Sequence, residues 1–255
     1  MYVVNLCFPG AESCDPDTVS HVVNGLLGAL RMNGQICGRE WPISIVDATC
    51  LVTVLLPEQD ALDGAHMNRY VQGAIVELRT AGLHDPDITI LGEDIDGATS
   101  CTCSTPGSYI LYTNYISLES PLRCGTCFNP KPLYTIPHTY DDEYYDIICW
   151  QSDRQACDTL QMNCSTLERA AMREMSRPDS SLSQRGIEIC SKIFAATGIP
   201  TYYYLYRYGA RSRKQELART CPSCGSSWLL ETPWHLFDFK CNQCRLLSNI
   251  SWDVR

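Results

Sequence analysis

The amino-acid sequence predicts an α+β protein with a ferredoxin-like N-terminal layer, a central α+β region with a helix pair, and a small C-terminal zinc ribbon. Strands and amphipathic helices alternate in residues 1–98, short aromatic strands precede helical periodicity in residues 99–208, and two Cys-x-x-Cys pairs follow in residues 209–255. At 255 residues the chain is long enough for two domains, or for one domain with a small appendage. We therefore predict a ferredoxin-like domain, a central cysteine-containing region, and a basic linker with the ribbon, with these same boundaries.

Residues 1–98 carry the pattern of a sheet covered by helices. Asp17 is a candidate cap for the first helix and Gly34 a candidate stop, whereas Asp63 and Gly82 bracket the second helix. The β-branched stretch between these helices suits a hairpin about Asp47-Ala48. The expected elements are a strand (2–8), a helix (17–34), the hairpin (43–56), a helix (63–82) and a strand (87–91). This order predicts two helices packed on one face of a single sheet.

A polar, turn-rich segment (92–106) separates this domain from the central region. The pattern Ser152-x-x-Gln155 predicts a capping box that opens a helix ending at Pro178, and a second helix closes at Gly198. The expected elements are strands at 109–115, 133–136 and 144–150, the helix pair, and a strand at 201–208.

Cysteine spacing gives the clearest functional signal. Two pairs separated by sixteen residues comprise Cys221, Cys224, Cys241 and Cys244. Two residues between thiolates let one turn present both sulfurs to one ion, and the intervening chain is long enough for a hairpin. Four buried or disulfide-bonded cysteines are the alternative. We predict structural Zn²⁺, because a closed site of four thiolates leaves no coordination position for a reactive water.

A second and less regular constellation comprises Cys101, Cys103, Cys124 and Cys127. A single-residue gap is less usual for a zinc ribbon, so reduced thiols without metal are the alternative to a second ion. A redox pair at Cys124-Gly-Thr-Cys127 is a third interpretation, but Pro130 and Pro132 disfavour the helix that such chemistry needs. We expect one Zn²⁺ in the chain and allow for two.

The remaining cysteines lack paired spacing. Cys157, Cys164 and Cys190 fall on apolar helix stripes and are expected in the core, and the other five carry no assigned chemistry. Sixteen cysteines behind an N-terminal segment without a basic n-region indicate a reducing compartment, and no apolar run reaches the roughly 18 residues of a membrane helix. We therefore expect a cytoplasmic protein that does not enter a membrane.

Basic side chains are concentrated near the C-terminus. Residues 1–206 hold 12 Lys and Arg against 25 Asp and Glu, whereas residues 207–255 hold 8 against 4. The candidate nucleic-acid contacts are Arg207, Arg211, Arg213, Lys214, Arg219, Lys240 and Arg245. A solvated linker is the alternative for this basic tail. Alternating tyrosines from Tyr202 to Tyr208 suit a base-stacking platform, but we favour the alternative in which their rings cover the helix pair.

Motifs of the commonest enzyme classes are absent from the sequence: it has no Walker A loop, dinucleotide-binding glycine fingerprint, His-Glu-x-x-His or Gly-x-Ser-x-Gly. An acidic pocket near Glu143 to Asp158 is the remaining catalytic candidate; its acids are Glu143, Asp146, Asp153 and Asp158. Exposed faces of helices and loops usually carry such residues. An enzyme is therefore our third functional interpretation, with no motif behind it.

Four stretches and the terminal cysteine pairs carry a family resemblance. The stretches are Ser120-Pro-Leu-Arg-Cys-Gly-Thr-Cys127, Tyr145-Asp-Ile-Ile-Cys-Trp-Gln-Ser152, Ala156-Cys-Asp-Thr-Leu-Gln-Met-Asn-Cys164 and Pro200-Thr-Tyr-Tyr-Tyr-Leu-Tyr206. They resemble a bacterial zinc-ribbon-containing family of unknown function for which nucleic-acid binding has been conjectured. The resemblance is firmest from about Cys101 onward, and it implies a ribbon and a nucleic-acid role without catalytic residues.

We therefore expect a binding protein whose ribbon and basic tail contact nucleic acid. The main alternative is a protein-binding adaptor or inhibitor, in which the acidic N-terminal body engages a basic partner. The excess of acids over residues 1–206 motivates this alternative, because complementary charge speeds the encounter of two proteins.

Overall fold

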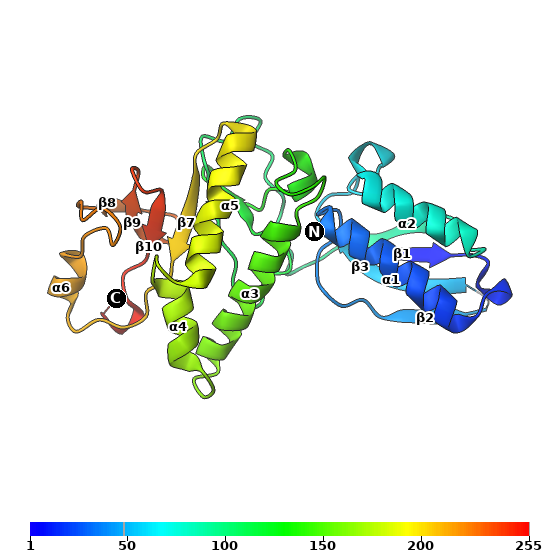
Figure 1. Ribbon diagram of the computed structural model, residues 1–255, viewed down its shortest axis with the longest axis horizontal. Helices are drawn as coiled ribbons and strands as arrows, with labels where there is room; N and C mark the ends of the chain where they lie inside the picture. The colour runs from blue at the N-terminus through cyan, green and yellow to red at the C-terminus, as the bar shows by residue number, and fades with distance from the viewer. Residues whose placement is uncertain (48, 255) are drawn as a thin grey trace. The chain divides into compact units, whose positions relative to one another are not determined.

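The chain divides into two units, each with a sheet of its own (Figure 1). The structure is a computed structural model that describes residues 1–47 and 49–254. Unit 1 comprises Met1–Thr102, Leu118–Ser120 and Asn129–Tyr145. Unit 2 comprises Cys103–Ser117, Pro121–Phe128 and Asp146–Arg255.

Unit 1 has the ferredoxin-like arrangement that the sequence predicts. Its elements are β1 (Tyr2–Phe8), α1 (Pro16–Met32), β2 (Ile43–Val46), β3 (Thr49–Leu56), α2 (Arg69–Thr80) and β4 (Asp87–Glu93). The strands are ordered β2-β3-β1-β4 and every neighbouring pair is antiparallel. This order and the helix after each central strand confirm the predicted fold class. The hairpin between β2 and β3 is also confirmed, although Ala48 lies outside the described residues.

The core of unit 1 follows from alternation along the strands. Val4, Leu6 and Phe8 of β1 are fully buried and belong to the same core as the apolar residues of α1 and α2. The cap of α1 differs from the prediction. Asp15, not Asp17, caps α1 by accepting a hydrogen bond from the backbone of Thr18, because its carboxylate stands three residues before an unpaired N–H.

The start of α2 is also later than predicted. Asp63 precedes a short 3-10 helix (Gly64–His66), and Asn68 caps α2 by accepting a hydrogen bond from the backbone of Val71.

The strand expected at 133–136 is wrong, because Leu133–Thr135 forms a 3-10 turn after Pro132. Gly34 ends α1 as expected. Its φ is +72°, and a Cβ there would lie 2.6 Å from the Cβ of Leu133.

Unit 2 contains a six-stranded mixed sheet. Its strands are β5 (Tyr109–Leu111), β6 (Leu122–Cys124), β7 (Thr201–Leu205), β8 (Leu229–Trp234), β9 (Phe237–Cys241) and β10 (Leu246–Ser248). They are ordered β6-β5-β7-β10-β9-β8, and β7 runs parallel to both β5 and β10. The three strands of the C-terminal segment therefore extend the sheet of the central region, with β10 as the connecting strand (Figure 1).

The helices of unit 2 differ most from the prediction. They are α3 (Tyr145–Met162), α4 (Glu168–Ser176), α5 (Ser181–Thr197) and the short α6 (Arg213–Leu217). The strand expected at 144–150 is wrong, because it forms the first turns of α3, and the expected capping box at Ser152 lies inside that helix. The first helix of the predicted pair is interrupted after Met162. No helix in the described part of the chain is long and apolar enough to cross a membrane.

Candidate metal centres

Three Cys-x-x-Cys turns are each followed by a residue with a positive φ. They span Cys124–Cys127, Cys221–Cys224 and Cys241–Cys244, and the residue after each has a positive φ: +64° at Phe128, +74° at Gly225 and +52° at Arg245. A bond from that residue closes two of the turns, since the N–H of Phe128 donates to Cys124 and that of Gly225 to Cys221. Such a turn directs both of its thiols to the same side, which is what a shared ion requires.

The C-terminal cysteine group consists of Cys221, Cys224, Cys241 and Cys244. Its four sulfur atoms lie within 4.8 Å of one another. The Sγ atoms of Cys224 and Cys241 are 3.7 Å apart, which is too long for a disulfide bond and close to the roughly 3.8 Å that separates two thiolates on a tetrahedral zinc ion. The residues therefore fit a closed four-thiolate site.

Electrostatics in this group favour a cation. Hydrogen bonds from Ser226 lower the pKa of the Cys224 thiol to about 6, whereas burial raises the pKa of the Cys241 thiol to about 12. The N–H of Cys244 also donates to the sulfur of Cys241 at 3.4 Å. Four neighbouring thiolates repel one another, so their joint ionisation requires a positive ion at the centre.

The central cysteine group consists of Cys101, Cys103, Cys124 and Cys127, and its four sulfur atoms also lie within 4.8 Å of one another. The N–H of Thr126 donates to the sulfur of Cys124 at 3.3 Å, as Cys244 does to Cys241 in the other group. Both predicted groupings are thus present, and either could hold a metal ion.

The other cysteines lie apart from these groups in the described residues. Cys190 is buried in unit 2, as expected from its helix stripe, and burial raises the pKa of its thiol. Cys157 is only partly buried. Cys164 is exposed, so its expected core position is wrong: it lies after α3, in the turn where its own φ is +50°.

Two of the predicted nucleic-acid contacts are engaged inside unit 2. Glu216 is 1% exposed, and its Oε2 lies 3.2 Å from the Nη2 of Arg207 while its Oε1 lies 3.3 Å from the Nε of Arg219. Arg219 also donates to Ser248 and to the carbonyl of Asn249. Burial lowers the pKa of Arg219 to about 10, so it stays charged at neutral pH.

Two further predicted contacts lie on aromatic rings. The Nζ of Lys240 is 3.6 Å from the ring centroid of Trp234, and the guanidinium of Arg245 is 3.8 Å from that of Phe194. The remaining three, Arg211, Arg213 and Lys214, are exposed around the start of α6. Arg213 donates to the carbonyl of Val254.

The predicted tyrosine platform is largely covered. Tyr202 and Tyr204 are buried in an aromatic and aliphatic cluster with Ile110, Phe237 and Leu247. The hydroxyl of Tyr204 donates to Asn249 at 2.8 Å. These two rings therefore form core with side chains of the sheet, whereas the favoured interpretation expected them to cover the helix pair. The ring that packs against Trp150 of α3 and Gly186 of α5 is that of Tyr203.

The acids near α3 have separate partners. Asp146 pairs with Lys192, Asp153 pairs with Arg185, and the Oδ2 of Asp158 accepts a hydrogen bond from the backbone of Tyr115. Glu143 belongs to unit 1, where burial raises its pKa. Acid–base catalysis by these residues gains no support from these contacts.

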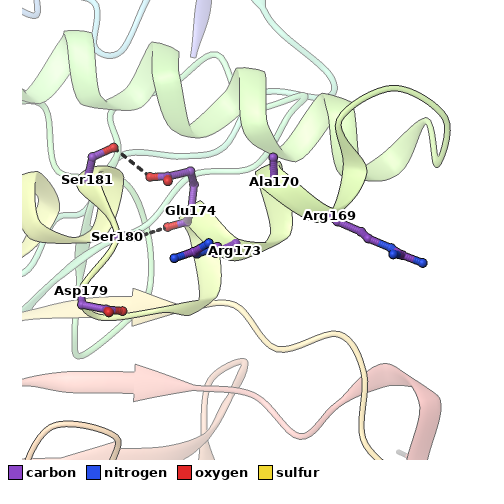
Figure 2. A pocket seen from close by; sticks show the side chains of 7 residues that line it. All are labelled: Arg169, Ala170, Arg173, Glu174, Asp179, Ser180 and Ser181. Carbon is purple, nitrogen blue, oxygen red and sulfur yellow. Dashed lines mark hydrogen bonds between the residues drawn. The ribbon is translucent and has the colours of Figure 1, made fainter.

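Two arginines on α4 were not among the predicted nucleic-acid contacts. Figure 2 shows Arg169 and Arg173 with Ser180 and Ser181 around one hollow of unit 2. The carboxylate of Glu174 in this hollow accepts hydrogen bonds from the hydroxyl of Ser181 and the N–H of Leu182, so it caps the start of α5. The signal was the four-residue spacing of Arg169 and Arg173, which puts them on one face of α4.

Comparison with known proteins gives relatives without assigned functions. Three family models match, each described as a domain of unknown function: DUF8589 over residues 1–92, DUF2310 over residues 103–206 and DUF8594 over residues 210–254. An uncharacterised protein of Haemophilus influenzae is 38% identical over 242 residues, which cover 93% of each chain. A second uncharacterised protein of that organism is 41% identical over 165 residues, covering 64% of this chain and 81% of its own length.

One solved structure, described as a candidate antibiotic biosynthesis monooxygenase from Deinococcus radiodurans, matches 37% of this chain and 96% of its own. It is 20% identical and the TM-score is 0.26.

Proposed function

The chain belongs to the family of these uncharacterised Haemophilus influenzae proteins, a bacterial family of unknown function, and we propose that it is a zinc-binding protein whose unit 2 contacts nucleic acid. The observation that carries the proposal is the convergence of four sulfur atoms within 4.8 Å in each of the two cysteine groups. Sites of four thiolates select zinc or iron–sulfur chemistry, and tetrahedral groups built from Cys-x-x-Cys turns suit structural Zn²⁺.

Zinc would supply the energy that holds the C-terminal strands together. The segment from Cys221 to Cys244 is short, and a small segment buries too little apolar surface to be stable without a metal or a disulfide. The site offers four protein ligands and no position for water. The proposed role of the metal is therefore structural.

The distribution of charge supports a nucleic-acid contact on unit 2. Unit 1 holds 5 Lys and Arg against 18 Asp and Glu, whereas unit 2 holds 15 against 11. Unit 1 therefore repels phosphate and unit 2 attracts it. Such attraction supplies most of the non-specific affinity of proteins for nucleic acid.

Four exposed cations are the best candidates for this contact. Arg169 and Arg173 of α4, and Arg211 and Lys214 near α6, have no carboxylate within 4.0 Å among residues 1–47 and 49–254. Arg207 and Arg219 contribute less to such a surface because Glu216 offsets their charge. The proposed mechanism is electrostatic, with zinc fixing the ribbon beside these side chains.

Charge reversal tests the proposal. In zinc-loaded full-length protein, Arg211→Glu with Lys214→Glu should weaken binding of a labelled single-stranded oligonucleotide at least tenfold and reduce the salt slope by about two. Fluorescence anisotropy over a range of KCl concentrations measures both. The matched control is Arg39→Glu with Arg79→Glu, which makes the same change of charge on unit 1. It should change the oligonucleotide affinity and the salt slope less strongly. Equal effects of the two pairs, or a native protein that binds no oligonucleotide, would reject the proposal.

A protein partner is the second candidate, and the charge of unit 1 favours it. An excess of 13 acidic over basic side chains there would steer a cationic protein toward unit 1. Affinity purification with nuclease treatment, followed by stopped-flow association with any protein that persists, separates the candidates. The adaptor proposal requires an association rate that falls with salt and is lowered by Asp87→Asn with Asp94→Asn.

A further inference from the structure

A second hollow of unit 2 is rich in arginine. Its lining includes Arg177, Asp179, Tyr206, Arg207, Arg219 and Pro222, which come from the loop after α4, the end of β7 and the first turn of the ribbon. We call this the Tyr206 hollow. Asp179 also lines the hollow of Figure 2, so the two hollows adjoin. Pro222 belongs to the Cys221–Cys224 turn, so the metal turn forms part of the wall.

The three guanidinium groups in this lining are held in place. Glu216 binds Arg207 through Nε and Nη2 and lies 3.3 Å from the Nε of Arg219. Asp179 binds Arg177 through its Nε at 2.9 Å and its Nη2 at 2.7 Å. These contacts leave the Nη1 of each arginine without a hydrogen-bond acceptor in the described part of the chain. Each guanidinium therefore keeps donors for a ligand.

A fourth guanidinium lies close to the ring of Tyr206. Arg154 is 2% exposed, and its Cζ is 6.0 Å from the ring centroid of Tyr206 and 5.6 Å from that of Tyr204. Its Nη1 has no hydrogen-bond partner, and no carboxylate of the described residues lies within 4.0 Å of it. An arginine cannot lose its charge by deprotonation, so this buried cation adds positive potential around the ring of Tyr206, which lines the hollow.

We propose that the Tyr206 hollow binds a phosphate group. Three guanidinium groups line it, and the carboxylates that bind them are those of Asp179 and Glu216. A dianionic phosphate would offset positive charge of this lining, and its oxygens would accept from the arginine forks. A carboxylate would supply one charge and two oxygens. The site requires no polymer, so it stands apart from the proposed nucleic-acid contact.

The Arg177–Asp179 ion pair provides a test that separates charge from folding. Arg177→Ala removes a cation from the hollow and leaves Asp179 facing the ligand, so phosphate affinity should fall at least tenfold. Asp179→Asn releases Arg177 and removes a repelling charge, so affinity should rise severalfold. Both variants break the same exposed ion pair. If that pair had a purely structural role, the phosphate affinity of both variants would shift in the same direction.

The measurement is isothermal titration calorimetry of zinc-loaded full-length protein with inorganic phosphate, a nucleoside 5′-monophosphate and acetate at equal ionic strength. We expect both phosphates to bind and acetate not to bind; tighter binding of the nucleotide would identify it as the source of the phosphate. The control pair is Arg185→Ala and Asp153→Asn, another exposed ion pair of unit 2, and neither should shift the affinity.

Three results would overturn the inference: no binding of either phosphate, shifts of one sign for Arg177→Ala and Asp179→Asn, or equal shifts in the control pair. Oligonucleotide binding by the same preparations separates this failure from failure of the proposed function. A protein that binds oligonucleotide but neither phosphate keeps the nucleic-acid proposal and loses the phosphate site.

Discussion

The sulfur atoms of Cys224 and Cys241 lie 3.7 Å apart although sixteen residues separate them in the chain. The β8–β9 hairpin brings them together, with Leu229 opposite Phe239 and Trp234 opposite Phe237. Packing of the β8–β9 hairpin and assembly of the four cysteines should therefore occur together. A cation at the centre converts the repulsion among four thiolates into attraction, so metal binding and folding of the ribbon should be coupled.

Removal of zinc should unfold the C-terminal strands. Because β10 also pairs with β7, a strong chelator should lower the thermal midpoint of unit 2 and increase hydrogen exchange in β8, β9 and β10. Hydrogen exchange followed by mass spectrometry, with and without chelator, measures this. Strands β1 and β3 of unit 1 serve as the internal control. Unchanged protection of β9 in metal-free protein would refute the coupling.

The two cysteine groups should hold metal independently. Cys127→Ser should remove one zinc ion and leave the C-terminal group loaded, because the two groups share no ligand. Metal content per chain, measured by plasma emission spectrometry, should fall by one. Cys149→Ser, in α3 and outside both groups, is the matched control and should leave the metal content unchanged. Loss of all metal from Cys127→Ser would contradict this assignment.

Glu216 should contribute strongly to the stability of unit 2. Glu216→Gln leaves Arg207 and Arg219 without their anion, and an uncompensated charge in a buried network costs about 3 kcal/mol. Urea unfolding of the zinc-loaded protein measures the free energy of unfolding. The control is Glu188→Gln, whose exposed pair with Lys192 should contribute less than about 1 kcal/mol. Equal losses from the two variants would show that the network adds no stability.

Gly186 should tolerate no side chain. A Cβ at this position of α5 would overlap the ring of Tyr203 and lie 2.8 Å from the Nε1 of Trp150, so Gly186→Ala should destabilise unit 2 by roughly 1–3 kcal/mol. Gly73→Ala in α2 is the matched control. Nothing lies within 4 Å of a Cβ there, so the helix should gain up to about 1 kcal/mol. A stabilising effect at Gly186 would mean that α5 and β7 are farther apart than described.

The N-terminal fold was predictable because its pattern is local and apolar. In β1 the buried residues Val4, Leu6 and Phe8 alternate with partly exposed ones, and helical periodicity marks α1. The cysteine groups were predictable for the same reason, since the spacing within each pair is fixed by one turn. The joining of two pairs into one group was also predicted, and the structure brings the four sulfur atoms of each group within 4.8 Å of one another.

The start of α3 was predicted as a strand, and the buried face of the rest of this helix is largely polar. Arg154, Gln155, Asp158 and Gln161 are all buried there, so hydrophobic periodicity carries little signal. Their partners are distant in sequence: Gln155 donates to Thr113 and to the carbonyl of Ser117. The engagement of Arg207 by Glu216 was hidden likewise, because burial of a glutamate cannot be read from composition.

Native mass spectrometry of the full chain, purified in the presence of zinc, counts the metal ions that the two cysteine groups hold. We expect two zinc ions per chain, with one lost in Cys241→Ser and none in Cys149→Ser. A native chain that carries no metal, or a Cys241→Ser variant with the same metal content as the native chain, would contradict this expectation.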